Sequence, residues 1–452
     1  MHPTRPSLRS RRSFLRDLAL GTAVAPWVTS GLIAQSPNSV IHHASFGCSG
    51  MAMSDVSSIS GHAAVKIVAG CDVDEKRTAD FRKKFPDARI YSDFRELLEK
   101  EKDLQTVNVS TPDHMHAPIA VSALNRGLHV YGQKPLAHHL HEVRRMTEIA
   151  RAKKLHTQMG IQIHSGSEYR TACKAVQDGV IGKIKEVHTW SSKKWGDNGA
   201  MPVKTEQPPE NLNWDLWLGI AEERPFIGGG FYHPGNWRKR LDFGTGTFGD
   251  MGCHIYDPVF KALALTAPLS IRSDGAKPNG HSWATDAIID YIFPGTAFTE
   301  GKTVRVVWYD GDQRPPQSVQ DAAKIVKGDK QHGLPDQGSI FLGTDGIMIL
   351  PHIAQPRIVR DKPGTFKEIE KVGGESHWHQ FIETALGNRA NADANWDYAG
   401  PLTEAVLLGS VATRFPKQTL AWDVAALKFT NADAANAFVT RTYRKGHEIA
   451  GL

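Results

Sequence analysis

The stretch that decides the fold is VIHHASFGCSGMAMSDVSSISGHAAVKIVAGCD, residues 40–72. Two apolar runs, at 40–46 and 63–70, flank a turn of small residues and a segment that can form a helix. A strand, turn, helix and strand within about 30 residues is the size of the βαβ unit that binds dinucleotides. The sequence therefore predicts that the chain begins its folded part with a doubly wound parallel sheet.

The turn in this stretch has the residues that a dinucleotide requires. Gly47 can adopt the conformation of a tight turn, and Ser49, Gly50 and Met51 let backbone N–H groups approach a pyrophosphate. Asp72 follows about 20 residues later, where a carboxylate accepts hydrogen bonds from the adenosine ribose. Because that carboxylate repels a 2'-phosphate, we expect NAD rather than NADP. The spacing also fits an ordinary strand-turn-helix connection, so the interpretation depends on the rest of the chain.

Strands and helices alternate as far as residue 160. We predict strands at 90–91, 106–110, 129–131 and 156–160, and helices at 75–85, 94–100, 118–126 and 141–153. This alternation is typical of a Rossmann domain, here residues 38–160, whose ligands bind beyond the carboxyl ends of the strands. Further cofactor contacts are expected along that edge from Thr111, Pro112, His114, His116, Gln133 and Lys134.

Residues 161–452 have a different pattern and predict a C-terminal α+β domain with a large, open, mostly antiparallel sheet. Predicted strands lie at 184–190, 287–293, 303–308, 339–342, 347–350 and 354–359. The passage 193–246 is rich in Pro, Gly and Trp and is too long for a plain connection. Its aromatic, arginine and amide groups suit a sugar ring, and the alternative is a loop that packs its own aromatic residues. Expected substrate contacts are Gln162, Tyr232, His233, Trp237 and Arg238.

Two short motifs predict the chemistry. Lys134 ends a strand and is fixed by Pro135, on the side where nicotinamide would lie. Asp250 and His254 are four residues apart and share one face of a helix. An imidazole with a carboxylate to orient it can carry the proton of a hydroxyl whose carbon loses hydride. We therefore predict Lys134, Asp250 and His254 as catalytic residues, with Asp250 and His254 also touching the substrate.

With these motifs the chain resembles the glucose-fructose oxidoreductase, inositol dehydrogenase and rhizopine-catabolism (Gfo/Idh/MocA) superfamily over nearly all of residues 40–445. In that superfamily a Glu-Lys-Pro motif and an Asp-x-x-x-His motif carry the chemistry, and Gln133 replaces the glutamate here. The resemblance implies that His254 is the general acid/base on a sugar hydroxyl, that Lys134 polarises the same oxygen, and that Asp250 orients or tunes the imidazole. It also implies a homodimer or homotetramer.

Residues 1–34 resemble a twin-arginine export signal, because Arg11 and Arg12 precede Phe14, Leu15 and a mostly apolar run. We expect a periplasmic protein with no stable membrane span after signal cleavage. A basic anchor, a disordered tail or an uncleaved form is the alternative. These residues hold five arginines and one aspartate, so the net charge of +6 falls to +2 without them. The basic charge therefore does not argue for a nucleic-acid partner.

The function expected from these features is the oxidation of a sugar or sugar derivative with NAD. Since a periplasm offers little free NAD, we expect a tightly held cofactor. One alternative is an NAD-dependent, redox-neutral glycoside hydrolase or lyase, although the Tyr-Pro-Thr-His segment of that branch is replaced here at residues 251–254. Another is a non-catalytic periplasmic sugar-binding protein. No metal is expected, because no carboxylate or cysteine joins the histidines at 114–141 at ligand spacing.

Overall fold

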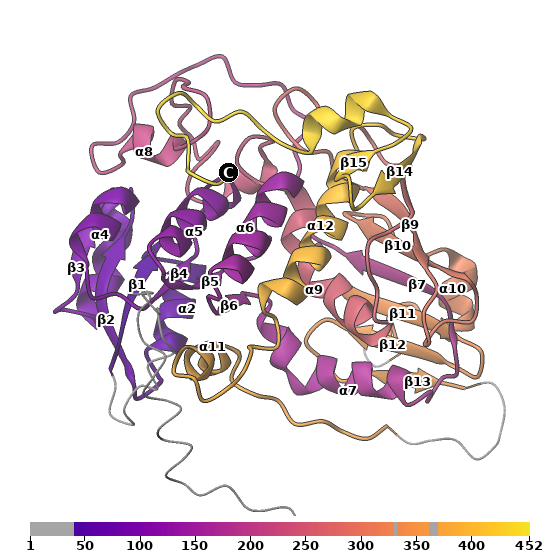
Figure 1. Cartoon of the computed structure of the whole chain (residues 1–452). Coiled ribbons are helices and arrows are strands. Elements are labelled where there is room, and N and C mark those ends of the chain that lie inside the picture. The colour runs from indigo at the N-terminus through magenta and orange to yellow at the C-terminus, as the bar shows by residue number, and fades with distance from the viewer. Residues whose placement is uncertain (1–39, 330–331, 361–368) are drawn as a thin grey trace, which may run out of the picture. The chain divides into compact units, whose positions relative to one another are not determined.

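The computed structural model describes residues 40–329, 332–360 and 369–452 (Figure 1). The predicted export signal, residues 1–34, lies outside the described residues. The described chain forms two sheets, one parallel and one mixed, with helices packed against both. None of the helices in this part of the chain is long and apolar enough to span a membrane.

The first sheet is parallel and has six strands in the order β3-β2-β1-β4-β5-β6, which confirms the predicted Rossmann sheet. Its apolar strands are buried because helices cover both faces. The strands are β1 (Ile41–Phe46), β2 (Val65–Cys71), β3 (Arg89–Tyr91), β4 (Thr106–Val109), β5 (His129–Gly132) and β6 (Thr157–Met159). The helices are α2 (Met51–Ile59), α3 (Ala79–Lys84), α4 (Phe94–Lys100), α5 (His116–Asn125) and α6 (Leu140–Ala152).

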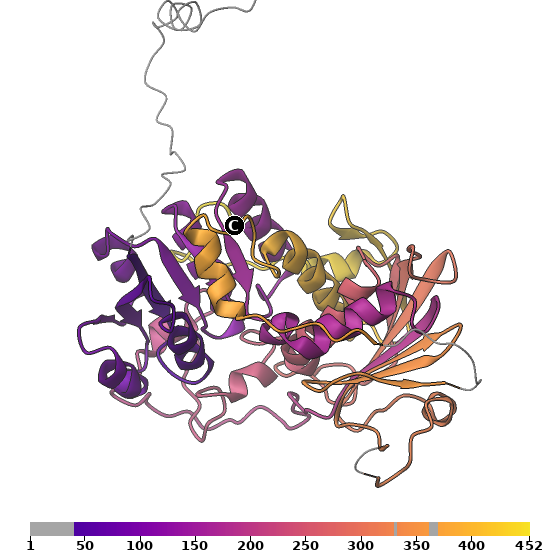
Figure 2. The same cartoon turned by 90° about the horizontal axis from the view of Figure 1, so that it is seen from below.

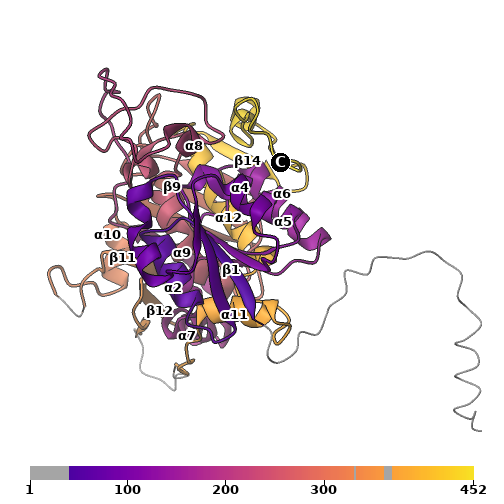
Figure 3. The same cartoon turned by 90° about the vertical axis from the view of Figure 1, so that its left-hand side faces the viewer.

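A helix from much later in the chain completes the cover of this sheet. In α11 (His377–Ala385), Phe381 and Ile382 pack with Ile41, Ile59 and Tyr131. Figures 1 and 3 show α11 beside α2. The first sheet therefore depends on residues beyond 160 for part of its core.

The second sheet has nine strands in the order β13-β12-β11-β7-β10-β9-β8-β14-β15. All neighbours in it are antiparallel except β7 and β10, which confirms the predicted mostly antiparallel sheet. The strands are β7 (Ile184–Ser191), β8 (Ser270–Ser273), β9 (Ile288–Pro294), β10 (Thr303–Asp310), β11 (Gln337–Gly343), β12 (Ile347–Pro351), β13 (Arg357–Val359), β14 (Thr419–Asp423) and β15 (Lys428–Phe429).

Three helices cover one face of this sheet and a short one covers part of the other (Figure 2). The first three are α7 (Ser167–Gln177), α9 (Gly246–Ala262) and α12 (Trp396–Ala412), and the short one is α10 (Gln317–Ala322). Helix α12 begins at Trp396, five residues before Pro401. The reason is a cap, because the Asn395 side chain accepts a hydrogen bond from Asp397 N at 3.0 Å.

The passage 192–245, which includes α8 (Trp214–Leu218), crosses the edge of the first sheet as a covering loop (Figure 1). It is joined there by main-chain hydrogen bonds from Glu75 N to Asn211 O and from Asn213 N to Val73 O, both 2.9 Å. The closing segment, residues 440–452, lies against this loop, with Arg444 N donating to Ile220 O at 2.9 Å.

Candidate active site

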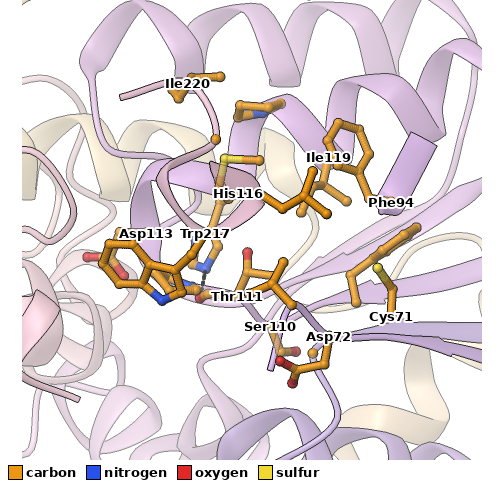
Figure 4. A pocket seen from close by; sticks show the side chains of 18 of the residues that line it. Cys71, Asp72, Phe94, Ser110, Thr111, Asp113, His116, Ile119, Trp217 and Ile220 are labelled. Atoms are coloured by element: carbon orange, nitrogen blue, oxygen red, sulfur yellow. Dashed lines mark hydrogen bonds between the residues drawn. The ribbon is translucent and has the colours of Figure 1, made fainter. Parts of the chain in front are cut away.

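A cavity of about 300 Å³ lies at the carboxyl edge of the first sheet, beneath the covering loop (Figure 4). The ends of β1, β2 and β4 form one wall, and Trp217 and Ile220 of the covering loop form another. The predicted cofactor residues that line it are Gly47, Ser49, Gly50, Met51, Asp72, Thr111, Pro112, His116, Gln133 and Lys134. A parallel sheet of this kind binds nucleotides at this edge.

The turn after β1 is tight, and it has no room for a side chain at Gly47. Gly47 has φ +98°, and a Cβ there would lie 2.8 Å from both Ser110 O and Ala52 Cβ. Gly50, with φ +56°, precedes α2, and no side chain of the described residues caps the first turn of that helix. The first N–H groups of α2 are therefore available to an anion at the cavity wall.

Asp72 fits the role of a ribose ligand. Its Oδ2 accepts a hydrogen bond from Cys48 N at 3.0 Å and its Oδ1 accepts one from Asp74 N at 3.1 Å, so the carboxylate is held at the end of β2. Burial raises the pKa of Asp72. Figure 4 shows Asp72 and Cys71 on one side of the cavity and Trp217 and Asp113 on the other. Arg77 and Arg95 line the cavity as well.

His114 does not line the cavity, although the sequence predicted a cofactor contact there. Its imidazole is buried, with Nε2 3.1 Å from Trp217 O and the ring packed edge-on against Phe243. Burial lowers the pKa of His114 to about 3, so the ring is neutral. It holds the covering loop against the first sheet. The sequence placed His114 at the correct edge but could not show that the loop covers it.

Gln133 lines the cavity, but its amide points into a buried polar cluster. Its Nε2 donates to Asp55 Oδ2 at 2.8 Å, and Asp55 also accepts hydrogen bonds from Ser110 Oγ and Trp378 Nε1, both at 2.9 Å. Burial raises the pKa of Asp55. Gly160 makes room, since a Cβ there would lie 2.5 Å from Gln133 Nε2. An uncharged amide beside Asp55 avoids placing two carboxylates together out of water.

Lys134 and Asp250 form a buried ion pair. Lys134 Nζ lies 2.6 Å from Asp250 Oδ1 and 2.9 Å from the main-chain oxygen of Asp250. The two side chains are 9% and 7% exposed. Trp195 Nε1 (2.8 Å), Arg238 Nε (3.2 Å) and Lys193 Nζ (3.4 Å) also donate to this carboxylate. Burial would raise the pKa of Asp250, but Lys134, Arg238 and Lys193 together hold that pKa well below its usual range.

His254 lies one turn after Asp250 on α9. Its Nδ1 is buried and has no hydrogen-bond partner among the described residues. Burial, followed by the charge of Lys134 and the ring of His352, holds the pKa of His254 well below its usual value. The imidazole is therefore neutral. Within the described chain no hydrogen bond joins Asp250 to His254, so Asp250 acts on this ring through its charge.

Helix α9 has no room for a side chain at two glycines. A Cβ at Gly249 would lie 1.9 Å from Oγ1 of Thr245, the residue before the helix. At Gly252 a Cβ would lie 2.7 Å from Phe248 of the same helix and 3.1 Å from Val406 on α12. The sequence Gly-Asp-Met-Gly is thus a packing motif, and it contains Asp250, one of the predicted catalytic residues.

The predicted substrate residues lie in different places. His233, Trp237 and Arg238 line the cavity, whereas Asp250 and His254 are not among its lining residues. Tyr232 is instead buried inside the covering loop, in a cluster with Trp214, Trp217 and Phe243. The prediction that Tyr232 contacts the substrate is therefore wrong. The alternative prediction, a loop that packs its own aromatic residues, holds for Tyr232, because a long loop needs a small core of its own. Gln162 lies beside Met51, with Nε2 3.7 Å from its Sδ.

Several residues at the site escaped prediction. Lys193 and Trp195 contact Asp250, and Gly446, His447, Glu448 and Ile449 of the closing segment line the cavity. No local pattern marks the closing segment. Asp55 could have been noticed, because it shares α2 with the buried residues Ala52, Val56 and Ile59. The structure groups no three His, Cys, Asp or Glu side chains for a metal ion within the described residues.

Comparisons with known proteins agree with this architecture. Residues 41–161 match the family model described as oxidoreductase family, NAD-binding Rossmann fold, and residues 166–307 match its C-terminal alpha/beta domain. The two matches together cover more than half of the chain, which therefore belongs to the Gfo/Idh/MocA oxidoreductase family.

The levoglucosan dehydrogenase of Pseudarthrobacter phenanthrenivorans is 23% identical over 42% of this chain and 40% of its own length. The inositol 2-dehydrogenase of Salmonella paratyphi B is 30% identical over 27% of this chain and 37% of its own length. The chain thus spans about two fifths of the curated relatives that it matches. The WlbA dehydrogenase of Bordetella pertussis, solved with NADH and UDP-GlcNAcA, shares the fold, with a TM-score of 0.60 at 13% identity over 85% of this chain and 99% of its own.

Proposed function

We propose that this protein is an NAD-dependent oxidoreductase that removes hydride from a hydroxyl-bearing carbon of a sugar or sugar derivative. The observation that carries the proposal is the convergence of Lys134, Asp250 and His254 beside a cavity built for a dinucleotide. Sugar alcohols and anhydrosugars appear in the names of the relatives, which supports this substrate class.

Each residue of the site has a role that follows from its charge. NAD, when bound, would accept the hydride. Lys134, held by Asp250, places a cation beside the hydroxyl oxygen and favours its loss of a proton. The neutral His254, whose Nδ1 has no partner among the described residues, accepts that proton. Asp250 keeps the Lys134 ammonium in place and balances part of its charge.

Tight retention of the cofactor is part of the proposal. The covering loop contributes Trp217 and Ile220 to the cavity wall, and the closing segment contributes residues 446–449. A nucleotide enclosed in this way leaves only when these segments move. Asp72 supports NAD over NADP.

We further propose that the protein is exported through the twin-arginine route to the periplasm and that it works as a homodimer or homotetramer. The sequence of residues 10–34 supports the first statement, and the family resemblance supports the second. Light scattering on the purified protein tests the assembly, and a monomeric mass would contradict it.

The experiment that tests the function is to unfold protein purified without added nucleotide and to identify the released nucleotide by mass spectrometry. We expect NAD or NADH in near-equal amount to protein, and reduction of the bound cofactor when sugars are added. Release of NADP would contradict the role of Asp72. An empty protein that binds no NAD would overturn the enzyme assignment and favour a sugar-binding protein.

A further inference from the structure

The charge around Asp250 is not balanced. Three cationic side chains, Lys134, Lys193 and Arg238, converge on this one carboxylate. A second acid that interacts with Lys134 and Arg238 is Asp113, which is buried, receives hydrogen bonds from Thr245 N and Oγ1, and has its pKa raised by burial. Even with Asp113 ionised, these three cations outnumber these two carboxylates. An excess of positive charge beside the reacting groups attracts an anion.

Two of the three cations have capacity for a substrate anion. Lys134 bonds both the carboxylate and the main-chain oxygen of Asp250, and its third N–H serves the reacting hydroxyl in the proposed function. Lys193 reaches Asp250 only at 3.4 Å and is 41% exposed. Arg238 is 28% exposed, and among the described residues Nε is its only guanidinium nitrogen that makes a hydrogen bond.

The Arg238 guanidinium is also held in a fixed plane. Its Cζ lies 4.3 Å from the centre of the Trp237 ring and 5.6 Å from that of Trp195. Trp195 donates a hydrogen bond to Asp250, so the carboxylate that Arg238 contacts also fixes the ring beside the guanidinium. A planar, braced guanidinium with two terminal nitrogens free matches the two oxygens of a carboxylate.

We propose that the substrate is a sugar derivative that carries a carboxylate, bound by Arg238 and Lys193 while Lys134 and His254 act on a hydroxyl. This inference rests on the proposed function and adds the chemical class of the substrate. Arg238 and Lys193 are substrate-binding residues in this scheme, and the hydroxyl that reacts lies on the same molecule as the carboxylate. The proton leaves the hydroxyl for His254 and the hydride leaves the carbon for NAD, so the step needs no further reactant.

The test compares acidic sugars with their neutral counterparts on the NAD-loaded protein. The panel consists of glucuronate, galacturonate, mannuronate and gluconate, with glucose, galactose, mannose and glucitol as neutral partners and glucose 6-phosphate as the phosphate probe. Dissociation constants are measured by calorimetry with the cofactor reduced, and cofactor reduction is followed separately. At least one acid should bind about tenfold or more tightly than its neutral partner, since a charge-assisted hydrogen bond contributes this much.

Variants locate the effect. Arg238→Gln should remove the preference for the acid over its neutral partner. Lys194→Gln is the matched control, because this half-exposed lysine pairs with Asp312 and not with Asp250. It should keep the preference. The proposal would be overturned if no acid binds more tightly than its neutral partner. It would also be overturned if Arg238→Gln keeps the preference for the acid, or if only the phosphate probe binds tightly.

The same measurements separate this inference from the proposed function. Tight binding of an acid without cofactor reduction by any sugar would support the anion site and contradict sugar oxidation. Cofactor reduction by a neutral sugar with no preference for acids would support sugar oxidation and contradict the anion site.

Discussion

At the scale of single residues, Asp250 is the charge around which the proposed catalytic side chains gather. It is buried, and Lys134 depends on it for a counterion. Replacing it by Asn leaves the ammonium of Lys134 out of water with no anion beside it, which costs about 3–5 kcal/mol. We expect Asp250→Asn to lose most activity and to lower the free energy of unfolding by about this amount at neutral pH, as measured by urea denaturation.

The pH dependence of this difference has a definite sign. The folded-state pKa of Asp250 is depressed, so its contribution is present above the unfolded pKa of about 3.9. It is lost as the pH falls below that value toward the folded pKa. The matched control is Asp397→Asn, because Asp397 pairs with Arg151 at an exposed position. That change should cost less than about 1 kcal/mol. Equal effects of the two substitutions would contradict the assignment.

Gln133 gives a second residue-scale prediction. Gln133→Glu puts a second carboxyl group against Asp55, 2.8 Å from the present amide nitrogen. Two buried carboxyl groups at this distance share a proton, so their pKa is raised in the folded state. A raised folded-state pKa gives stability that is present below the unfolded pKa and lost as the pH rises through the folded value.

The variant should therefore match the wild type near pH 4 and lose stability progressively toward pH 8, by about 2 kcal/mol or more. Thermal unfolding across this range measures it. Gln317→Glu, at an exposed position on α10, serves as the control and should have no such slope beyond a small surface effect. A Gln133→Glu variant with an unchanged pH profile would show that the carboxyl group leaves the cluster.

At the scale of elements, we expect the closing segment to slow the dissociation of the nucleotide. Removing residues 446–452 takes away four residues that line the cavity, together with the Ala450 and Gly451 carbonyls that accept from Asn125 and Arg145. The truncated protein keeps the hydrogen bonds from Tyr443 to Glu142 and from Arg444 to Asp215. We expect NAD to dissociate about tenfold or more faster, since an enclosing segment contributes mainly to the dissociation rate.

The control is removal of residues 451–452, which do not line the cavity. That truncation should leave the dissociation rate within about twofold of the wild type. Both truncated proteins should unfold near the wild-type temperature once NAD is removed, which separates loss of a cover from loss of the fold. Equal dissociation rates for the three proteins would show that the closing segment does not retain the nucleotide.

The elements that the sequence predicted well are those with strong local signals. The apolar run 106–110 becomes β4, and the alternating run 303–308 becomes β10. Strands β8, β14 and β15 were missed because they are short, with four, five and two residues. At the site, Lys134, Asp250 and His254 could be chosen from their motifs. The burial of Tyr232 and the contacts of Lys193 depend on how the covering loop folds, which no local pattern specifies.

At the scale of the whole molecule, the active site exists only when both sheets are complete. Lys134 follows β5 of the first sheet, whereas Asp250 belongs to α9, which packs on the second. The nucleotide cavity also needs the covering loop and the closing segment. Such a protein can hold its cofactor only when it is folded. Export in the folded state would deliver the cofactor together with the chain.

This requirement leads to a prediction about export. In the full-length chain, replacing Arg11 and Arg12 together by Lys should keep the protein in the cytoplasm, because the twin-arginine route reads the arginine pair and not its charge. Cell fractionation measures the outcome, and NAD released from the periplasmic wild-type fraction should be near one per protein. The same change at Arg5 and Arg9 is the control and should leave export intact. A doubly substituted protein that still reaches the periplasm would contradict the route, and periplasmic protein without NAD would contradict export with the cofactor in place.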